Sequence, residues 1–185
     1  MKKVFIDCGG HLGESVKKFK SSSLYSEDFI IYSFEPLIYF LDQYKDPSII
    51  SINKAIWIKD GILPFYIDKT NNVARGSTLI KNKTSGKLDK ENPIFVECID
   101  FSHWILNTFD RNDCLILKMD IEGAEYDILN KMIVDNSISY INKAYIEFHW
   151  KKIGLSYFDH EKIISKLRNV SSLKLYDEFT KMKKV

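Results

Sequence analysis

VFIDCGGHLGES, residues 4–15, is the stretch of sequence that decides the fold. Its apolar residues lead into an acid, Asp7, and then into Gly9, Gly10 and Gly13, a pattern typical of a buried strand that enters a tight turn and a helix. The backbone N–H groups at the start of such a helix favour a carboxylate or another anion. The same turn also serves as a plain connection in doubly wound folds, so this stretch by itself leaves open whether the turn binds a ligand.

Strands and helices continue to alternate along the rest of the chain. Apolar runs predict strands over residues 29–34, 49–58, 93–99, 115–119, 144–148, 173–176 and 179–184. Helical spacing predicts a short helix capped by Asp100 and helices over residues 14–20, 37–44, 124–134 and 160–168. A turn at residues 59–61 predicts a β-hairpin inserted after the third strand, with its return arm over residues 63–67. Residues 71–92 are polar and lysine-rich, which predicts that most of them form a surface loop and a candidate lid, with residues 76–80 as a better ordered stretch.

This alternation predicts a single α/β domain over residues 1–185. Strands that alternate with helices form a mostly parallel sheet with right-handed crossovers and with helices on both faces. In such sheets, ligands bind outside the carboxyl ends of the strands, at the point where the strand order reverses. We therefore look for the functional site among the residues that follow the predicted strands.

Composition limits the partners and the compartment. The 185 residues carry a formal net charge of +2, and only three of the 27 basic residues are arginines, which disfavours a nucleic-acid partner. No apolar stretch has the length of a signal-peptide core or a membrane span, so we expect no membrane partner. The three cysteines are an odd number without CxxC spacing, so neither a disulfide framework nor a structural zinc site is indicated. Together these features predict a soluble, cytoplasmic protein.

Polar residues follow four of the predicted strands: Asp7, Glu35, Asp120, Glu147 and His149. Alternate residues of a strand share a face, so Lys118 projects with Asp120, and Glu147 projects with His149. An acid in the place of Glu35 can accept two hydrogen bonds from a ribose diol; the alternative, a solvated carboxylate at a helix start, does not explain its pairing with the turn after Asp7. Neither GxGxxG nor GxxxxGK[ST] is present.

Six segments of the chain resemble the FkbM-type S-adenosylmethionine-dependent methyltransferases, a branch of the class I Rossmann-like methyltransferases. They are VFIDCGGHLGES, SFEP, AIW, VECIDF, LKMDIEGAE and YIEFH, of which LKMDIEGAE, residues 117–125, is the most specific. The resemblance implies a three-layer fold with a mostly parallel seven-stranded sheet and a reversed C-terminal hairpin strand. It also implies S-adenosyl-L-methionine as the cofactor and, usually, O-methylation of a sugar, a glycan or a small natural product. Many relatives have GAN where this chain has Gly9, Gly10 and His11, so His11 is expected to change the contacts to the methionine part of the cofactor.

The resemblance also assigns cofactor-binding positions. Asp7, Gly9 and Gly13 would surround the methionine portion, and Glu35 would hold the ribose hydroxyls. Asn53, Ala55 and Ile56 would lie beside the adenine. Gly10, His11 and Pro36 adjoin these positions and complete the candidate set. Asp120 and Glu122 would lie at the end of the cofactor where the methyl group is transferred.

An alcohol acceptor must lose a proton, so the site needs a base. His149 titrates near neutrality and Glu147 could orient it, while Asp120, kept ionised by Lys118, is the rival base or holds the acceptor hydroxyl. A histidine bonded only to backbone is the alternative for His149. Lys118, Asp120, Glu147 and His149 are therefore the candidate catalytic residues.

Two further features leave alternatives open. Arg75 in the polar loop, together with Glu122, is a candidate for contacting the acceptor, although an ordinary surface loop is as good an interpretation. Asp120, Glu122, Glu147 and His149 could also hold magnesium or manganese, but carboxylates are expected near a cationic cofactor and the spacing is not a recognised ligand signature, so we assign no metal.

Three other functions compete with O-methylation of a small molecule or glycan. A nucleic-acid methyltransferase of the same fold would carry an NPPY-type motif where this chain has DIEG, or a Pro-Cys pair, and both are missing. A catalytically silent binding module would have no chemical reason to keep Asp7, Glu35 and Asp120. An oxidoreductase with a nicotinamide cofactor is the remaining alternative.

Overall fold

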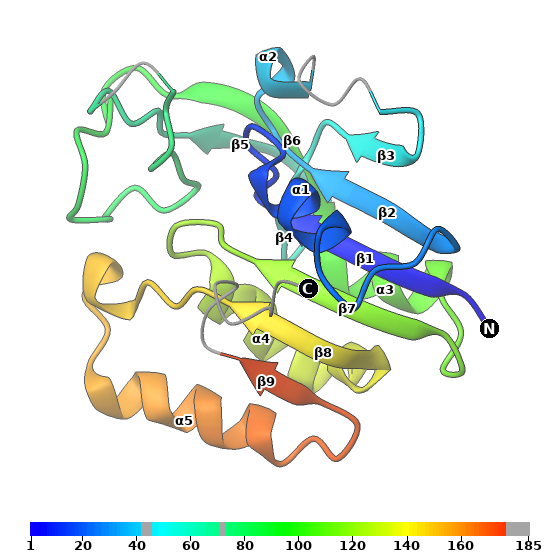
Figure 1. Ribbon diagram of the computed structural model, residues 1–185. Helices are drawn as coiled ribbons and strands as arrows, with labels where there is room; N and C mark the ends of the chain where they lie inside the picture. Colours follow the sequence, from blue (N-terminus) through cyan, green and yellow to red (C-terminus); the bar gives the residue numbers. More distant parts are fainter. Residues whose placement is uncertain (42–45, 71–72, 177–185) are drawn as a thin grey trace.

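A parallel six-stranded sheet forms the centre of the computed structural model, which describes residues 1–41, 46–70 and 73–176 (Figure 1). The strands follow the order β3-β2-β1-β7-β8-β9, and every pair of neighbours is parallel. Their bounds are β1 Lys3–Cys8, β2 Phe29–Phe34, β3 Ile49–Ile52, β7 Cys114–Met119, β8 Ile141–Ile146 and β9 Lys174–Tyr176. The order reverses between β1 and β7, so ligands are expected at the carboxyl ends of these two strands.

The register brings the carboxyl ends of the central strands to one edge of the sheet. Cys8 at the end of β1 pairs with Phe34 of β2 and with Met119 of β7, and Met119 pairs with Ile146 of β8. The residues that follow these four strands therefore begin at the same level. This register is what gathers the polar residues predicted at the strand ends.

Helices cover both faces of the sheet, as the alternation predicts. The helices are α1 Glu14–Lys20, α2 Ile38–Leu41, α3 Phe101–Thr108, α4 Glu125–Val134 and α5 Tyr157–Arg168, with 3-10 helices η1 Ser137–Tyr140 and η2 Trp150–Ile153. On one face, Phe19 of α1 stacks on Phe5 of β1. On the other, Ile105 of α3 and Leu129 of α4 join the cluster around Ile6. Phe5 and Ile6 point to opposite faces and both are fully buried, as a central strand requires.

Local capping sets two of the helix starts. The Asp100 side chain accepts a hydrogen bond from the backbone N–H of His103, which confirms it as the cap of α3. Ser156 caps α5 in the same way by accepting from the backbone N–H of Asp159. The last helix therefore begins at Tyr157, earlier than the predicted range of 160–168.

The prediction of one strand over residues 49–58 is wrong, because the chain changes sheets within it. The side-chain amide of Asn53 donates to the backbone oxygens of Glu35 and Pro36, and the chain turns there. After the turn, β4 Ala55–Trp57 enters a second sheet of order β4-β6-β5, with β5 Gly61–Phe65 and β6 Ile94–Asp100.

The inserted hairpin is also a wrong prediction, since β4 and β5 do not pair with each other. β6 lies between them, parallel to β4 and antiparallel to β5. Cys98 of β6 pairs with Ala55 on one side and with Gly61 on the other. The pairing buries Val96 and Cys98, and a two-stranded hairpin would leave this apolar face uncovered.

The seventh strand and the reversed hairpin are not part of the described structure. The strand predicted over residues 179–184 lies outside the described residues, as does the end of the helix predicted over residues 37–44. Among the described residues the main sheet has six strands, all parallel. None of the described helices combines the length and the apolar character that crossing a membrane requires.

Gly9→Ala should destabilise the protein more than Gly154→Ala. Both glycines have a positive φ, 85° and 75°, so alanine costs roughly 1–2 kcal/mol of backbone strain at either position. At Gly9 the new Cβ would meet the carbonyl oxygen of Asp120 at 2.1 Å, whereas a Cβ at Gly154 would have no atom of the described residues within 4 Å apart from its chain neighbours. We expect Gly9→Ala to lose a further 1–3 kcal/mol or so in free energy of unfolding, measured by urea denaturation. Equal losses would contradict the close approach of these strand ends.

Candidate active site

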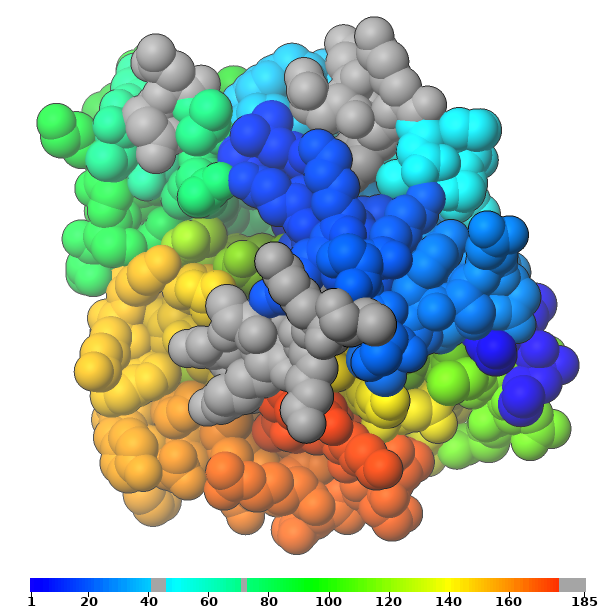
Figure 2. All heavy atoms as spheres, in the orientation of Figure 1, coloured from blue at the N-terminus to red at the C-terminus, as the bar shows by residue number. Residues whose placement is uncertain are grey.

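A cavity of about 850 Å³ lies at the carboxyl ends of the central strands, where the strand order reverses. Its size falls in the range of ligand sites. Twelve of the residues predicted from sequence line it: Gly9, Gly10, His11, Glu35, Pro36, Ala55, Ile56, Arg75, Lys118, Asp120, Glu122 and Glu147. The predicted Asp7, Gly13, Asn53 and His149 are not among the residues that line it. On the face shown in Figure 2, the blue N-terminal segments, the green loop and the yellow segments after β8 lie next to one another.

The glycine turn forms one wall of the cavity. The backbone N–H groups of Gly9 and Gly10 both donate to the carbonyl oxygen of Phe34, at 3.1 and 3.0 Å. Gly13 has a φ of 75° and begins α1 without a side-chain cap. His11 also has a positive φ, 46°, and its Nε2 lies 2.6 Å from the carbonyl oxygen of Val73. His11 therefore connects the glycine turn to the polar loop.

A buried pair of charged residues, Asp7 and Lys118, stabilises this glycine turn. They face each other in the register of β1 and β7, with 3.1 Å between Lys118 Nζ and Asp7 Oδ1. Lys118 also donates to the carbonyl oxygen of Gly9 at 2.8 Å, whereas Asp120 Oδ2 is 3.9 Å away. Burial lowers the pKa of Lys118, but the charges of Asp7 and Asp120 outweigh it and leave the pKa above its usual value. Lys118 is thus a buried cation whose closest ionic partner is Asp7.

Glu35 reaches the cavity from the end of β2 and is almost fully buried. Its two carboxylate oxygens accept hydrogen bonds from the backbone N–H groups of His11 at 2.8 Å and Leu37 at 2.9 Å. Burial raises the pKa of Glu35, and these two bonds oppose the rise. Ala55 and Ile56 also line the cavity, so its lining combines this carboxylate with buried apolar residues.

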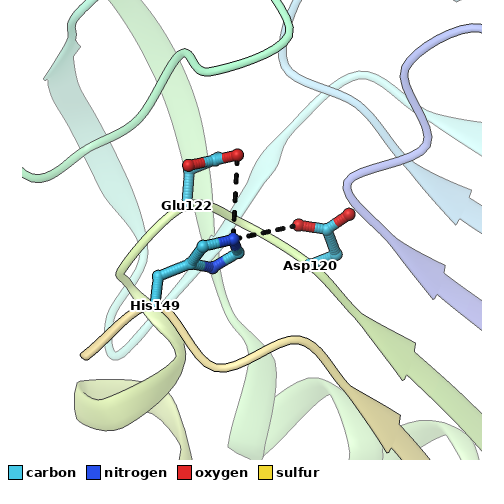
Figure 3. Close-up of side chains that lie close together, drawn as sticks. All are labelled: Asp120, Glu122 and His149. Atoms are coloured by element: carbon cyan, nitrogen blue, oxygen red, sulfur yellow. Dashed lines mark ion pairs between the residues drawn. The ribbon is translucent and has the colours of Figure 1, made fainter. Parts of the chain in front are cut away.

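Three carboxylates surround one ring nitrogen of His149. Its Nε2 lies 3.4 Å from Glu147 Oε1, 3.7 Å from Glu122 Oε1 and 3.8 Å from Asp120 Oδ1. Figure 3 shows the imidazole pointing toward Asp120 and Glu122. His149 is only 3% exposed and does not line the cavity itself, whereas the three carboxylates around it do. The structure thus brings together the four residues for which the sequence left a metal site open, and Asp120, Glu122 and His149 offer ligand atoms within 4.8 Å of one another.

Glu125, which the sequence analysis missed, orients His149. The fully buried Glu125 Oε1 lies 2.8 Å from His149 Nδ1 and also accepts from the backbone N–H of Ile121. Glu147 lies instead near Nε2, so its predicted role as the orienting acid passes to Glu125. The sequence did hold a sign of this role: Glu125 lies in the first turn of the helix after Gly123, where unpaired backbone N–H groups need acceptors.

The surroundings of His149 shift the pKa of its imidazole. Burial by itself lowers the pKa of the imidazole. The hydrogen bond to Glu125 and the charges of Glu125 and Glu122 outweigh burial, so the pKa lies above its usual value. Without another cation at Nε2, the ring therefore binds its second proton more readily than a free histidine does.

Glu122 is held in place by the polar loop. It has a φ of 59°, which is unusual for a long side chain, and its carbonyl oxygen accepts from Thr78 at 2.9 Å. Its Oε2 pairs with Lys83 at 2.7 Å and with Lys152 at 3.0 Å. Burial raises the pKa of Glu122, but His149, Lys83 and Lys152 outweigh it and lower the pKa below its usual value.

The prediction that most of residues 71–92 form a surface loop is wrong for Lys83, whereas Thr78 lies in the stretch 76–80 that was expected to be better ordered, and residues 71–72 lie outside the described residues. Thr78 is fully buried and Lys83 is 2% exposed, because both bind Glu122. Thr84 donates to the carbonyl oxygen of Lys152. Arg75 does remain at the surface, where it pairs with Glu14.

A sequence profile of the methyltransferase FkbM domain family matches residues 7–172. The chain belongs to this family of methyltransferases, enzymes that usually use S-adenosylmethionine. The crystal structure of methyltransferase FkbM from Methylobacillus flagellatus KT is similar in fold, with a TM-score of 0.51 and 14% sequence identity. The similarity covers 91% of this chain but only 38% of that one. A sequence comparison with curated proteins gives no significant match.

The imidazole of His149 should titrate above the ordinary histidine value of about 6.5 in metal-free buffer. Glu125→Gln should lower this pKa, because it removes the negative charge next to Nδ1. An NMR pH titration of the ring C–H resonances measures both values, and the exposed His103 provides a reference resonance. An unchanged His149 pKa in the variant would show that Glu125 does not control it.

The same pair should make stability depend on pH. Because folding raises the pKa of His149, the Glu125–His149 interaction stabilises the protein fully below about pH 6.5, and this stabilisation is lost as the pH rises through the folded-state pKa. The loss of unfolding free energy caused by Glu125→Gln should therefore be larger at pH 6 than at pH 9 or so. Urea denaturation at both pH values measures the difference.

Proposed function

We propose that the protein is an S-adenosyl-L-methionine-dependent O-methyltransferase that acts on a hydroxyl of a sugar, a glycan or a small natural product. One observation carries the proposal. A single cavity joins an acid suited to a ribose diol, Glu35, to a cluster of carboxylates around a buried imidazole, His149. The first feature fits an adenosyl group, and the second fits the removal of a proton.

The residues present fit this cofactor. A carboxylate has about four acceptor positions, and the backbone N–H groups of His11 and Leu37 occupy two of those on Glu35, so two remain for ribose hydroxyls. Ala55 and Ile56 would contact the adenine. Gly9 would face the methionine portion, in a turn whose shape a side chain at Gly9 would disrupt. When bound, the cofactor supplies a methyl group that its sulfonium already activates.

The chain's own residues would then position the acceptor and take its proton. Holding the two reactants at attack geometry is worth about 7–11 kcal/mol of the barrier. Asp120 is 35% exposed on its side chain and lines the cavity, so its carboxylate can accept the hydrogen bond of the acceptor hydroxyl. His149 stands behind it, with Nε2 3.8 Å from Asp120 Oδ1 and with Glu125 stabilising the protonated ring. We therefore assign the removal of the proton to Asp120 and His149 acting together, and not to either residue alone.

The rim of the cavity favours a polyhydroxyl acceptor. Polar side chains line it: Glu14, Ser15, Lys18, Arg75, Ser77, Glu122 and Glu147. Trp150 offers an aromatic surface on which a sugar ring can stack. A nucleic-acid substrate would need more cationic contacts than this rim offers, since the chain has a net charge of only +2 and, among the described residues, Arg75 is the one arginine that lines the cavity.

We place the reaction in the cytoplasm. Cys8, Cys98 and Cys114 are free thiols, and Cys8 and Cys98 are buried. Unpaired thiols suit a reducing compartment. The acceptor is therefore expected to be an intracellular molecule or glycan precursor.

Glu35→Gln should weaken S-adenosylmethionine binding. The variant keeps one acceptor oxygen and loses the charge, which costs roughly 1.5–3 kcal/mol for bonds to a charged group, a 10- to 150-fold rise in Kd. Isothermal titration calorimetry with S-adenosylmethionine and S-adenosylhomocysteine measures it, with Glu27→Gln at an exposed position as the matched control. Unchanged affinity would remove the ribose assignment, and binding of NAD alone would overturn the proposed function.

Asp120→Asn should abolish most methyl transfer without loss of cofactor binding. General acid–base catalysis contributes about 10²- to 10⁴-fold, so kcat should fall by at least that lower factor. The assay is transfer of a labelled methyl group to a panel of sugars and small alcohols, and Asp110→Asn, an exposed acid, is the control. Transfer to nucleic acid but not to any hydroxyl would favour the competing substrate class. Cofactor binding without any transfer would favour a silent module.

A further inference from the structure

The Nε2 atom of His149 has no hydrogen-bond partner among the described residues, although it is buried. The side chain is 2% exposed, and its ring points into the carboxylate cluster (Figure 3). Buried polar atoms are almost always bonded to protein, to water or to an ion. The surroundings of Nε2 therefore indicate what partner it is built to meet.

The atoms nearest to Nε2 are carboxylate oxygens at separations that suit a shared ion. They are Glu147 Oε1 at 3.4 Å, Glu122 Oε1 at 3.7 Å and Asp120 Oδ1 at 3.8 Å. Around an octahedral ion with bonds of about 2.1 Å, neighbouring ligands are about 3 Å apart and opposite ones about 4.2 Å apart. The three observed separations lie between these limits and exceed ordinary hydrogen-bond lengths.

We propose that His149, Asp120 and Glu122 form a binding site for a divalent cation of the Mn²⁺ type, with the half-exposed Glu147 nearby. The set combines one imidazole with two carboxylates. Carboxylate oxygens suit Mg²⁺, Ca²⁺ and Mn²⁺, and imidazole suits transition-metal ions, so a transition-metal ion that accepts oxygen ligands, such as Mn²⁺, fits the mixed set. Binding of the ion does not depend on the proposed function.

Glu125 gives His149 the form that a metal ligand needs. With Nδ1–H donated to the buried Glu125 carboxylate, the lone pair of the neutral imidazole lies on Nε2. Metal-bound histidines usually carry such a partner on their other nitrogen, which fixes the ring and increases its basicity. Glu125 is thus a positioning residue for the proposed ion.

Asp120 and Glu122 are held in a suitable orientation, because each directs one carboxylate oxygen toward Nε2 and the other toward a lysine. Glu122 directs Oε2 to Lys83 and Lys152 and leaves Oε1 toward the ring. Its positive φ of 59° and the bond from Thr78 keep it in this position. Backbone strain of this kind is characteristic of functional sites.

The site opens onto the cavity through its acids, since Asp120, Glu122 and Glu147 line the wall. An ion there has coordination positions open to the cavity. A hydroxyl that reaches it would have its pKa lowered, which would assist the proposed O-methylation. This catalytic role, unlike binding of the ion, rests on the proposed function.

The test is a titration of the chelator-treated protein with Mn²⁺ alone, in which the EPR signal of free Mn²⁺ is measured. We expect one ion per chain with submillimolar affinity. Asp120→Asn and His149→Gln should each weaken binding by about 100-fold, and Glu125→Gln by about 10- to 100-fold. Asp110→Asn and His103→Gln are matched controls at exposed positions and should bind as the wild type does.

A second measurement keeps the test valid if a buried variant fails to fold. Substoichiometric Mn²⁺ added to the wild-type protein should broaden the NMR resonances of the His149 ring before those of His103. The proposal is overturned if the wild-type protein binds no Mn²⁺ below millimolar concentrations, if folded Asp120→Asn binds it normally, or if the His149 resonances stay sharp. In that case His149 serves as an imidazolium that neutralises its three acids.

Calorimetry with S-adenosylmethionine on the same metal-free sample separates this proposal from the proposed function. Cofactor binding without Mn²⁺ binding would overturn only the metal site. Mn²⁺ binding without cofactor binding would overturn only the proposed function. Methyl transfer that continues unchanged in excess chelator would overturn the catalytic role of the ion.

Discussion

The buried ion pair between Asp7 and Lys118 is the interaction on which the site depends. These residues face each other across β1 and β7, the two strands between which the strand order reverses. Lys118 also binds the carbonyl oxygen of Gly9, so one ammonium group holds both the strand ends and the glycine turn. Removing one partner of a buried pair costs roughly 3–5 kcal/mol in general, because the other charge is left without compensation. The pair thus fixes the turn on which Glu35 and Asp120 converge.

A second set of contacts joins the chain's middle and last thirds at the same edge. Glu125 at the start of α4 binds His149, which follows β8. Glu122 binds Lys83 of the polar loop and Lys152 of η2. These ionic contacts concentrate charge on one wall of the cavity, while Ala55 and Ile56 keep another wall apolar. A cavity with one charged and one apolar wall suits a ligand that has an aromatic part and a cationic or hydroxyl-bearing part.

Much of this edge could be predicted because it follows from local pattern. The residues after β1, β2, β7 and β8 were identifiable as polar positions behind apolar runs, and a parallel sheet must bring such ends together. The second sheet was not predictable in this way. Periodicity identifies strands but not their partners, so it could not show that β6 separates β4 from β5. Nor could it show that Lys83, in a polar stretch, is buried against Glu122.

The amino-acid sequence by itself determined the α/β class, the strand–turn–helix unit around Gly9 and the acids at the strand ends. Each of these depends on residues close together in the chain, where spacing and φ preferences act directly. The tertiary structure decided which acid orients His149, where Asn53 lies and how the polar loop is anchored. Those outcomes depend on contacts between residues as far apart in the sequence as Thr78 and Glu122, and only the packed sheet brings such residues within bonding distance. A carboxylate's role therefore follows from the partner that the fold places beside it.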